Sequence, residues 1–111
     1  MELKGRVALV TGAGRRLGRV MAAALAARGA GVAIHHHASS QGADELREEI
    51  LADGGRAACF EADLTDAPAA RALAQRVVEE FGRLDVLVNS AAVMHRLSFD
   101  ETTPEQWDAI L

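Results

Sequence analysis

The sequence of 111 residues contains no tyrosine, and Lys4 is its only lysine. It has a single cysteine, Cys59, which excludes a disulfide within the chain, fits a reducing compartment and is expected in the core. No apolar run approaches the roughly 20 residues of a membrane span. The opening residues MELKGRV lack the apolar core of a secretory signal. We therefore expect a cytoplasmic protein without a membrane partner.

Positive charge is also scarce. The formal net charge is -4 at pH 7, and lysine and arginine form no long cluster. A nucleic-acid surface needs such a cluster, so we expect no nucleic-acid partner. Half of the residues are hydrophobic, and the length suits one small domain. Residues 1–111 are therefore predicted to form a single domain with a hydrophobic core.

Short apolar runs alternate with stretches of helical periodicity. The runs predict four buried strands, at residues 6–11, 31–36, 56–61 and 85–89. Apolar residues at helical spacing predict helices over 16–28, 43–51 and 70–81, each ending near a glycine. This alternation is typical of a parallel sheet covered by helices on both faces. The predicted fold class is α/β, a doubly wound parallel sheet that binds ligands at the carboxyl ends of its strands.

A glycine-rich stretch, TGAGRRLG, joins the first expected strand to the first expected helix. Gly12, Gly14 and Gly18 give the spacing G-x-G-x-x-x-G, one residue longer than the common dinucleotide fingerprint. Without side chains the backbone can approach a pyrophosphate, and the N–H groups at a helix N-terminus face the anion. A stretch of this kind can also be a simple tight turn. The strand before it and the helix after it favour phosphate binding.

The stretch from Thr11 to Gly18 resembles the T-G-x-x-x-G-x-G loop of the short-chain dehydrogenase/reductases, except that Arg16 stands in place of the middle glycine. Ala62-Asp63-Leu64 is similar to the family's adenine-recognising Asp-Val/Leu. Asn89-Ser90-Ala91-Ala92 resembles its N-N-A-G motif, with departures at the second and fourth residues, and the ending TPEQWDAIL resembles its next helix. The resemblance covers the whole chain. It implies a Rossmann fold, an NAD(P) cofactor and hydride transfer to or from a carbonyl or imine-like carbon.

Two details resemble one subgroup of that family, the pteridine reductases. They are Arg-Arg-Leu-Gly in the loop and a histidine-rich strand end followed by serine, HHHASS at 35–40. The frequent arginine of this segment in the subgroup is Ala38 here. Other reductases of the family share both features, so a 3-oxoacyl-type carbonyl reductase or an alcohol dehydrogenase of the family is the alternative.

The end of the second expected strand predicts the choice between NADP and NAD. An NAD site usually has Asp or Glu there to bind the ribose hydroxyls, but this chain has histidines at 35–37 and no carboxylate until Asp44. A 2′-phosphate would therefore meet no repulsion. Arg15 and Arg16 are expected to clamp it because guanidinium groups match phosphate geometry, and Ser39, Ser40 and the histidine rings offer further donors. The predicted cofactor is NADP(H), in preference to NAD(H).

Each of these assignments has a plainer alternative. Either arginine could be a solvated surface charge, and Asp63 could be a helix cap near Thr65. Three consecutive histidines do not make a metal site, because adjacent strand residues point to opposite faces, and no metal is predicted. The residues predicted to contact the cofactor are Gly12, Gly14, Arg15, Arg16, Leu17, Gly18, His36, His37, Ser39, Ser40, Asp63, Leu64, Asn89, Ser90 and Ala91.

The resemblance implies catalytic groups that this sequence does not contain. In the family a tyrosine acts as general acid, a lysine lowers the pKa of that tyrosine, a serine polarises the substrate and an asparagine completes a water relay. The chain has no tyrosine, and Lys4 lies too far upstream. No catalytic residue is therefore predicted in it. A helix predicted to begin at Thr103 stops at Leu111 while still incomplete, so we expect the chain to be the front, cofactor-binding part of a longer reductase, inactive by itself.

That reductase is expected to act on a small carbonyl or pterin substrate and to assemble as a homodimer or homotetramer. The rival from another class is a nucleotide-binding module that has no catalytic half. The coding sequence after Leu111 distinguishes the two, since Ser followed by Tyr-x-x-x-Lys marks the enzyme. In the chain alone, Val86, Leu87 and Val88 are predicted to form an exposed sheet edge, which would favour aggregation.

Overall fold

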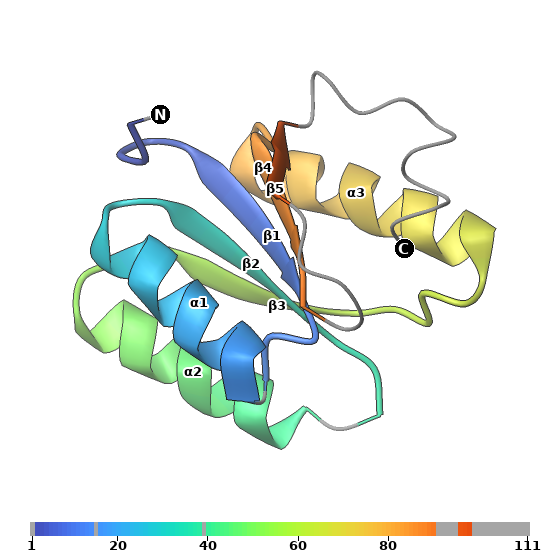
Figure 1. Ribbon diagram of the computed structural model, residues 1–111, viewed down its shortest axis with the longest axis horizontal. Coiled ribbons are helices and arrows are strands. Elements are labelled where there is room, and N and C mark those ends of the chain that lie inside the picture. Colours follow the sequence, from blue (N-terminus) through green and yellow to red (C-terminus); the bar gives the residue numbers. More distant parts are fainter. Residues whose placement is uncertain (1, 15, 39, 91–95, 99–111) are drawn as a thin grey trace.

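The computed structural model describes residues 2–14, 16–38, 40–90 and 96–98. The strands are β1 (Val7–Thr11), β2 (Gly31–His36), β3 (Ala57–Glu61), β4 (Val86–Asn89) and β5 (Arg96–Ser98). The helices are α1 (Arg16–Ala27), α2 (Gln41–Ala52) and α3 (Ala67–Phe81). The strands form one sheet in the order β3-β2-β1-β4-β5. Figure 1 shows that α1 and α2 cover one face of this sheet and α3 covers the other.

Four strands of the sheet are parallel. β1 pairs with β2 and with β4, and β2 pairs with β3. From β1 the chain winds outward through β2 to β3, and then returns to β4 on the other side of β1. The strand order thus reverses beside β1, and folds of this kind bind ligands at such a point, beyond the carboxyl ends of the strands. The predicted doubly wound α/β sheet is confirmed.

The sheet is buried on both faces because its strands are mostly apolar, and every residue of β1 is buried. On one face Val10 and Ile34 belong to the same core cluster as Leu46 of α2. On the other face Leu9 shares a cluster with Leu73 of α3. Each side chain of this size contributes roughly 1.5–3 kcal/mol when fully buried. The two layers therefore hold β1, and with it the start of the glycine-rich stretch, in a fixed place.

The helices differ from the prediction mainly at their ends. α3 begins at Ala67, three residues before the predicted start at residue 70, because Asp66 has extended backbone and a proline stands in the first turn. Ala67 and Pro68 are exposed, so an apolar stripe, which reports burial, does not include them. None of the described helices is long and apolar enough to cross a membrane. The helix predicted from Thr103 lies outside the described residues.

The prediction of an exposed sheet edge at Val86, Leu87 and Val88 is wrong. β5 pairs with β4 in antiparallel orientation, opposite these three residues. Their exposed fractions are 8%, 0% and 1%. A strand of three residues carries too little periodicity to be found in a sequence, which is why the covering strand was not predicted. An open edge at β4 therefore no longer supports the expected aggregation.

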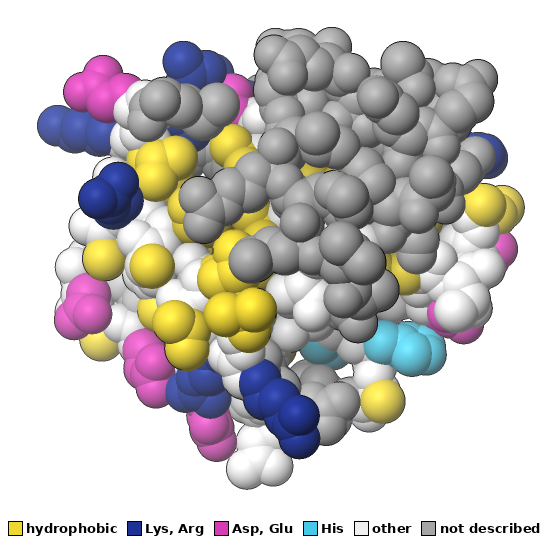
Figure 2. Space-filling model, in the orientation of Figure 1, with side chains coloured by type: hydrophobic (Ala, Val, Ile, Leu, Met, Phe, Trp, Pro, Cys, Tyr) yellow, Lys and Arg dark blue, Asp and Glu magenta, His cyan; other side chains and the backbone are white. Residues whose placement is uncertain are grey.

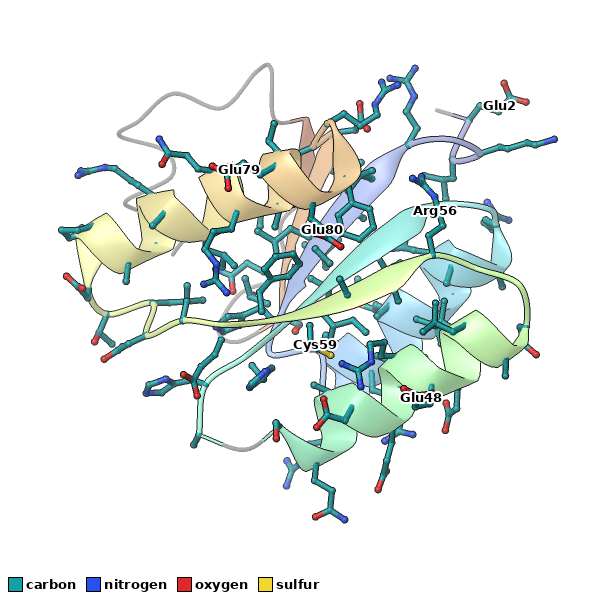
Figure 3. The ribbon with its side chains drawn as sticks, turned by 180° about the vertical axis from the view of Figure 1, so that it is seen from behind. Glu2, Glu48, Arg56, Cys59, Glu79 and Glu80 are labelled. Carbon is teal, nitrogen blue, oxygen red and sulfur yellow. The ribbon has the colours of Figure 1, made fainter. Side chains whose placement is uncertain are left out.

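Cys59 lies on β3 and points toward α2 (Figure 3). Its thiol donates a weak hydrogen bond to the Ala43 carbonyl oxygen at 3.4 Å. The side chain packs against the core cluster on the α1 and α2 face of the sheet, in agreement with its predicted core position. Partial burial raises the pKa of the thiol, so Cys59 is a packed, protonated side chain at neutral pH.

Asp85 joins the start of β1 to the start of β4. Its carboxylate accepts hydrogen bonds from the Val7 N–H at 2.8 Å and from two nitrogens of the Arg83 guanidinium at 2.8 Å each. The Arg6 guanidinium lies 3.4 Å from the same carboxylate. Burial raises the pKa of Asp85, but the hydrogen bonds from Arg83 and Val7 outweigh burial and hold the pKa below its ordinary value.

We expect Asp85→Asn to lower the free energy of unfolding at pH 7 by about 1.5–3 kcal/mol, the range for hydrogen bonds to a charged group. Because the folded-state pKa is depressed, the carboxylate stabilises the fold above the unfolded pKa of about 3.9, and this stabilisation is lost as the pH falls through the folded value. Urea denaturation checks this: the difference between wild type and variant should shrink on going from pH 7 to about pH 3. The exposed Asp53→Asn serves as the control. A difference that stays the same at both pH values would contradict the prediction.

Candidate functional site

The carboxyl ends of β1, β2 and β4 meet at one edge of the sheet, where the glycine-rich stretch connects β1 to α1. Gly12 directly follows β1 and has a φ of +61°, a left-handed conformation that glycine adopts without steric cost. The chain therefore turns sharply from β1 into α1. The first N–H groups of a helix have no partners within it, and an anion is the ligand that such groups bind.

Gly18 lies in the first turn of α1 and is buried. A Cβ at this position would lie 2.5 Å from the Gly12 carbonyl oxygen and 2.5 Å from the Ser90 Oγ. The helix thus packs against the turn after β1 and against the end of β4 so closely that only glycine fits. This close approach is the packing role that the last glycine of a dinucleotide-binding loop performs.

Gly14 meets the N-terminal turn of α2. A Cβ on Gly14 would lie 3.0 Å from the Ala43 nitrogen, and a Cβ on Gly42 would overlap the Gly14 carbonyl group. The absence of both side chains lets α2 touch the loop, and the N-terminal ends of α1 and α2 lie next to each other there (Figure 1). Packing on α2 accounts for Gly14 independently of any ligand.

Arg16 is the first residue of α1 and has a φ of +49°, the only positive φ outside glycine in the described part of the chain. A left-handed conformation costs a residue with a side chain roughly 1–2 kcal/mol. The family that this loop resembles has glycine at this position, and the backbone conformation gives a physical reason for it. The Arg16 side chain is exposed, so its guanidinium is available at the mouth of the loop.

The ends of β1 and β4 are joined by side-chain hydrogen bonds. The Thr11 hydroxyl donates to the Asn89 Oδ1 at 2.9 Å, and the Ser90 hydroxyl donates to the Thr11 carbonyl oxygen. Thr11 and Asn89 are almost completely buried, at 0% and 3% exposed. Ser90 departs from the family pattern, and its short hydroxyl holds the two strand ends together beside Gly18.

His35, on β2, connects this loop to the end of β3. Its imidazole Nδ1 accepts a hydrogen bond from the Gly12 N–H at 3.0 Å, and its Nε2 lies 2.8 Å from the Ala62 carbonyl oxygen. The residue is 4% exposed. Burial lowers the pKa of His35, and the bond to Ala62 only partly opposes this effect. His35 was not among the predicted site residues, although its alternation with the buried Ala33 places it on an inward face.

The next two histidines have different surroundings. His36 is half-buried, and its Nδ1 is buried without a hydrogen-bond partner in the described part of the chain. His37 and Ser40 are exposed. Histidine side chains reach the molecular surface in Figure 2. Along the chain no carboxylate lies between β2 and Asp44, although Asp63 after β3 is close enough to His37 for their charges to interact.

Asp63, after β3, is exposed and forms a local turn. Its Oδ1 accepts hydrogen bonds from the Thr65 N–H at 3.0 Å and the Thr65 hydroxyl at 2.6 Å. These two bonds lower the pKa of the carboxyl group. The N-cap residue of α3 is Asp66, so Asp63 is not the helix cap considered as its alternative. Leu64 is half-buried and packs against the core cluster on the α3 face of the sheet.

Two further features lie on α1 and α2. Figure 2 shows hydrophobic side chains gathered over α1, where Leu17 and Val20 are 53% and 65% exposed. A separate hollow between α1 and α2, lined among others by Ala26, Ile50 and Arg56, lies at the other ends of these helices.

Within the described ranges no three metal-binding side chains form a group. The predicted site residues outside those ranges are Arg15, Ser39 and Ala91.

Comparison with known proteins identifies the group to which this arrangement belongs. The family model described as short chain dehydrogenase matches residues 6–111. The chain belongs to the short chain dehydrogenase family. It is 43% identical over 109 residues to an uncharacterized oxidoreductase of Methylorubrum extorquens, covering 98% of this chain and 44% of that protein. It is also 43% identical over 110 residues to a hydroxynaphthalene reductase of Aspergillus fumigatus, covering 99% of this chain and 40% of that protein.

A solved structure of the family agrees with the fold. It is a short chain dehydrogenase from Burkholderia cenocepacia in complex with NADP, 42% identical to this chain, with a TM-score of 0.79 over 99% of this chain and 45% of the other. The chain therefore spans less than half the length of the relatives it matches. In this chain, the described residues of the loop and of the β2 and β4 ends lie at one edge of the sheet. Asp63 follows the outer strand β3, and His35 is the contact that the prediction missed.

Proposed function

We propose that the chain binds NADP(H) and forms the cofactor-binding part of a short-chain reductase. The observation that carries this proposal is the edge of the sheet where the turn at Gly12, the close packing at Gly18 and the N-terminus of α1 meet. The bound nicotinamide supplies or accepts the hydride. The residues of this chain bind the dinucleotide and orient it.

The pyrophosphate is expected against the N-terminus of α1. Gly12 and Gly18 leave the backbone uncovered there, so oxygen atoms can approach its N–H groups. The Gly14 contact brings the first turn of α2 to the same place. Two helix N-termini with positive partial charge therefore favour a doubly charged pyrophosphate over a neutral ligand.

The 2′-phosphate of NADP is expected beside Arg16 and the end of β2. Arg16 is exposed at the mouth of the loop, and His36 is half-buried at the end of β2. His37 and Ser40 are exposed next to it, and the corresponding carboxylate of an NAD site is missing. The NADP bound to the Burkholderia cenocepacia relative supports the same choice. Arg15 and Ser39 are proposed as further contacts.

The two ends of the cofactor are assigned to opposite sides of the loop. Asp63 and Leu64 are proposed to meet the adenine, with the hydrogen bonds from Thr65 holding the Asp63 carboxylate in place. Leu17, whose side chain is exposed, is proposed to contact the nicotinamide side. Asn89 at the end of β4 and Ser90 after it are proposed to lie on that side, with Ala91 as a further proposed contact.

The reaction needs groups that the chain does not contain. With no tyrosine in the sequence, the family's general acid is absent, and the relatives are more than twice as long as this chain. We propose that the remaining part of a longer reductase supplies the catalytic tyrosine, lysine and serine. We further propose that this longer reductase is a cytoplasmic homo-oligomer.

The substrate is proposed to be a small carbonyl or pterin compound. The hydroxynaphthalene reductase of Aspergillus fumigatus, at 43% identity, supports an aromatic carbonyl substrate. The Arg-Arg-Leu-Gly and HHHASS stretches support a pterin. Both substrates accept a hydride at an unsaturated carbon, so the cofactor site serves either one.

Calorimetric titration of the chain with NADP+ and NAD+ tests the proposal. We expect NADP+ to bind at least about tenfold more tightly, because charge-assisted hydrogen bonds to the 2′-phosphate contribute about 1.5–3 kcal/mol. The fragments 2′,5′-ADP and 5′-AMP should show the same order, which assigns the difference to the adenosine end. NADPH should not be oxidised when a quinone-type ketone or a dihydropterin is added. Absence of dinucleotide binding would refute the proposed site, and substrate-dependent oxidation would refute the proposed division of labour.

A further inference from the structure

The ring of His35 lies between two segments that the proposed cofactor spans, the turn after β1 and the turn after β3. A backbone N–H can only donate, so the Nδ1 that faces the Gly12 N–H must carry a lone pair. The proton therefore sits on Nε2 and is donated to the Ala62 carbonyl oxygen, 2.8 Å away. The hydrogen bonds of the ring require the neutral form.

We propose that His35 is a positioning residue for the cofactor: its neutral ring holds the phosphate loop to the turn before Asp63, and its protonation releases that link and weakens dinucleotide binding. The proposal rests on the proposed function. A proton on Nδ1 would point at the Gly12 N–H, so two donors would face each other and one hydrogen bond would be lost. Gly12 opens the turn that presents the N–H groups of α1, and Ala62 precedes the proposed adenine contact.

Backbone hydrogen bonds keep the effect local. The Ala13 N–H donates to the His35 carbonyl oxygen at 3.1 Å, and the Ala62 N–H donates to the His36 carbonyl oxygen at 3.2 Å. These bonds do not depend on the ring and keep the strand ends paired after it is protonated. Loss of the ring contacts is therefore expected to change the position of the Gly12 N–H and to leave the sheet folded.

Charged groups near the His35 ring lie on its own strand and after β3. On its own strand His36 and His37 follow, and positive charge on either one disfavours protonation of His35. After β3 the first charged side chain is Asp63, which is hydrogen-bonded to Thr65.

In the turn after β1, residues 12–14 carry no charged side chain. On α3, the guanidinium of Arg76 donates a hydrogen bond to the Glu61 carbonyl oxygen. Burial, the main cause, lowers the pKa of His35. The link is therefore intact at neutral pH and is lost only as the pH falls through the folded-state pKa of His35, which lies below the ordinary value of about 6.5.

Affinity for NAD+, measured from pH 8 down to the lowest pH at which the chain stays folded, tests this link. NAD+ has no 2′-phosphate. The pH dependence of its affinity is therefore not affected by ionisation of that phosphate or by the contacts of His36 and His37 with it. We expect the wild-type affinity to fall by roughly twofold to tenfold on acidification, the range for one hydrogen bond. His35→Asn, which keeps an acceptor near the Gly12 N–H but does not titrate, should bind as the wild type does at pH 8 and show no acid response. His35→Leu should bind weakly at every pH.

Ring-nitrogen NMR shifts and thermal melts of each variant complete the experiment. The shifts should report an Nε2-protonated ring at pH 7, and the melts should show that all three proteins stay folded over the pH range. The same acid response in wild type and His35→Asn, or an Nδ1-protonated ring, would overturn the role of His35 while leaving the cofactor site intact. Absence of NAD+ and NADP+ binding at pH 8 would instead overturn the proposed function itself.

Discussion

Gly18→Val is expected to weaken dinucleotide binding strongly and to destabilise the fold. Its Cβ would lie 2.5 Å from both the Gly12 carbonyl oxygen and the Ser90 Oγ, and the first of these is backbone that cannot rotate away. Added bulk in a packed site costs about 1–3 kcal/mol or more. Because α1 must move away from the loop to accept the side chain, its N-terminal N–H groups leave the anion site. We expect the affinity for NADP+ to fall by at least about tenfold to hundredfold.

The matched control is Ala24→Val, which places the same β-branched side chain on an exposed position of the same helix. It removes a good helix former but meets neither the loop nor β4, so NADP+ affinity should stay close to that of the wild type. Calorimetry measures the affinities, and urea denaturation measures the stabilities. Equal affinities of the Gly18 variant and the control would show that the close approach of α1 is not needed for binding.

Arg16→Gly is expected to separate cofactor choice from loop stability. The φ of +49° at this residue favours glycine, so the variant should raise the free energy of unfolding by about 1 kcal/mol. The same change removes the guanidinium proposed to bind the 2′-phosphate. NADP+ affinity should then fall about tenfold to hundredfold, corresponding to about 1.5–3 kcal/mol, and NAD+ affinity should change much less.

Arg19→Gln is the control for the loss of one positive charge from α1. Arg19 forms ion pairs with Glu45 and Glu49 at 3.3 Å and 2.7 Å and lies outside the proposed phosphate contacts. It should leave the preference for NADP+ over NAD+ unchanged. If Arg16→Gly weakens NADP+ and NAD+ equally, then Arg16 supports the pyrophosphate or the loop and does not read the 2′-phosphate.

The strands, the helices and the phosphate loop follow from local patterns in the sequence. Strands such as VALVT are continuous apolar runs because both of their faces are covered, and the stripe of α3 repeats at helical spacing because one face packs on the sheet. Gly12 and Gly18 are recognisable because a turn and a close helix approach leave no room for a side chain. These features are encoded within a few neighbouring residues.

The features that were missed depend on contacts between distant segments. β5 pairs with β4 through only three residues, and His35 joins two turns that lie 23 and 27 residues away along the chain. The role of Gly14 is set by its contact with Gly42 in the first turn of α2. No local periodicity reports such contacts. The left-handed backbone of Arg16 is similar, since the sequence shows a departure from the family's glycine but not the conformation that made glycine suitable.

Amide chemical-shift mapping of the chain during titration with NADP+ tests the central claim most directly, because it reports each backbone N–H separately. We predict the largest shifts at Gly12, Gly14 and Gly18, with further shifts around His36 and Asp63. When NAD+ replaces NADP+, the shifts at Arg16 and His36 should be smaller. Shifts confined to the hollow between α1 and α2 near Ile50 and Arg56, with none at the glycines, would contradict it.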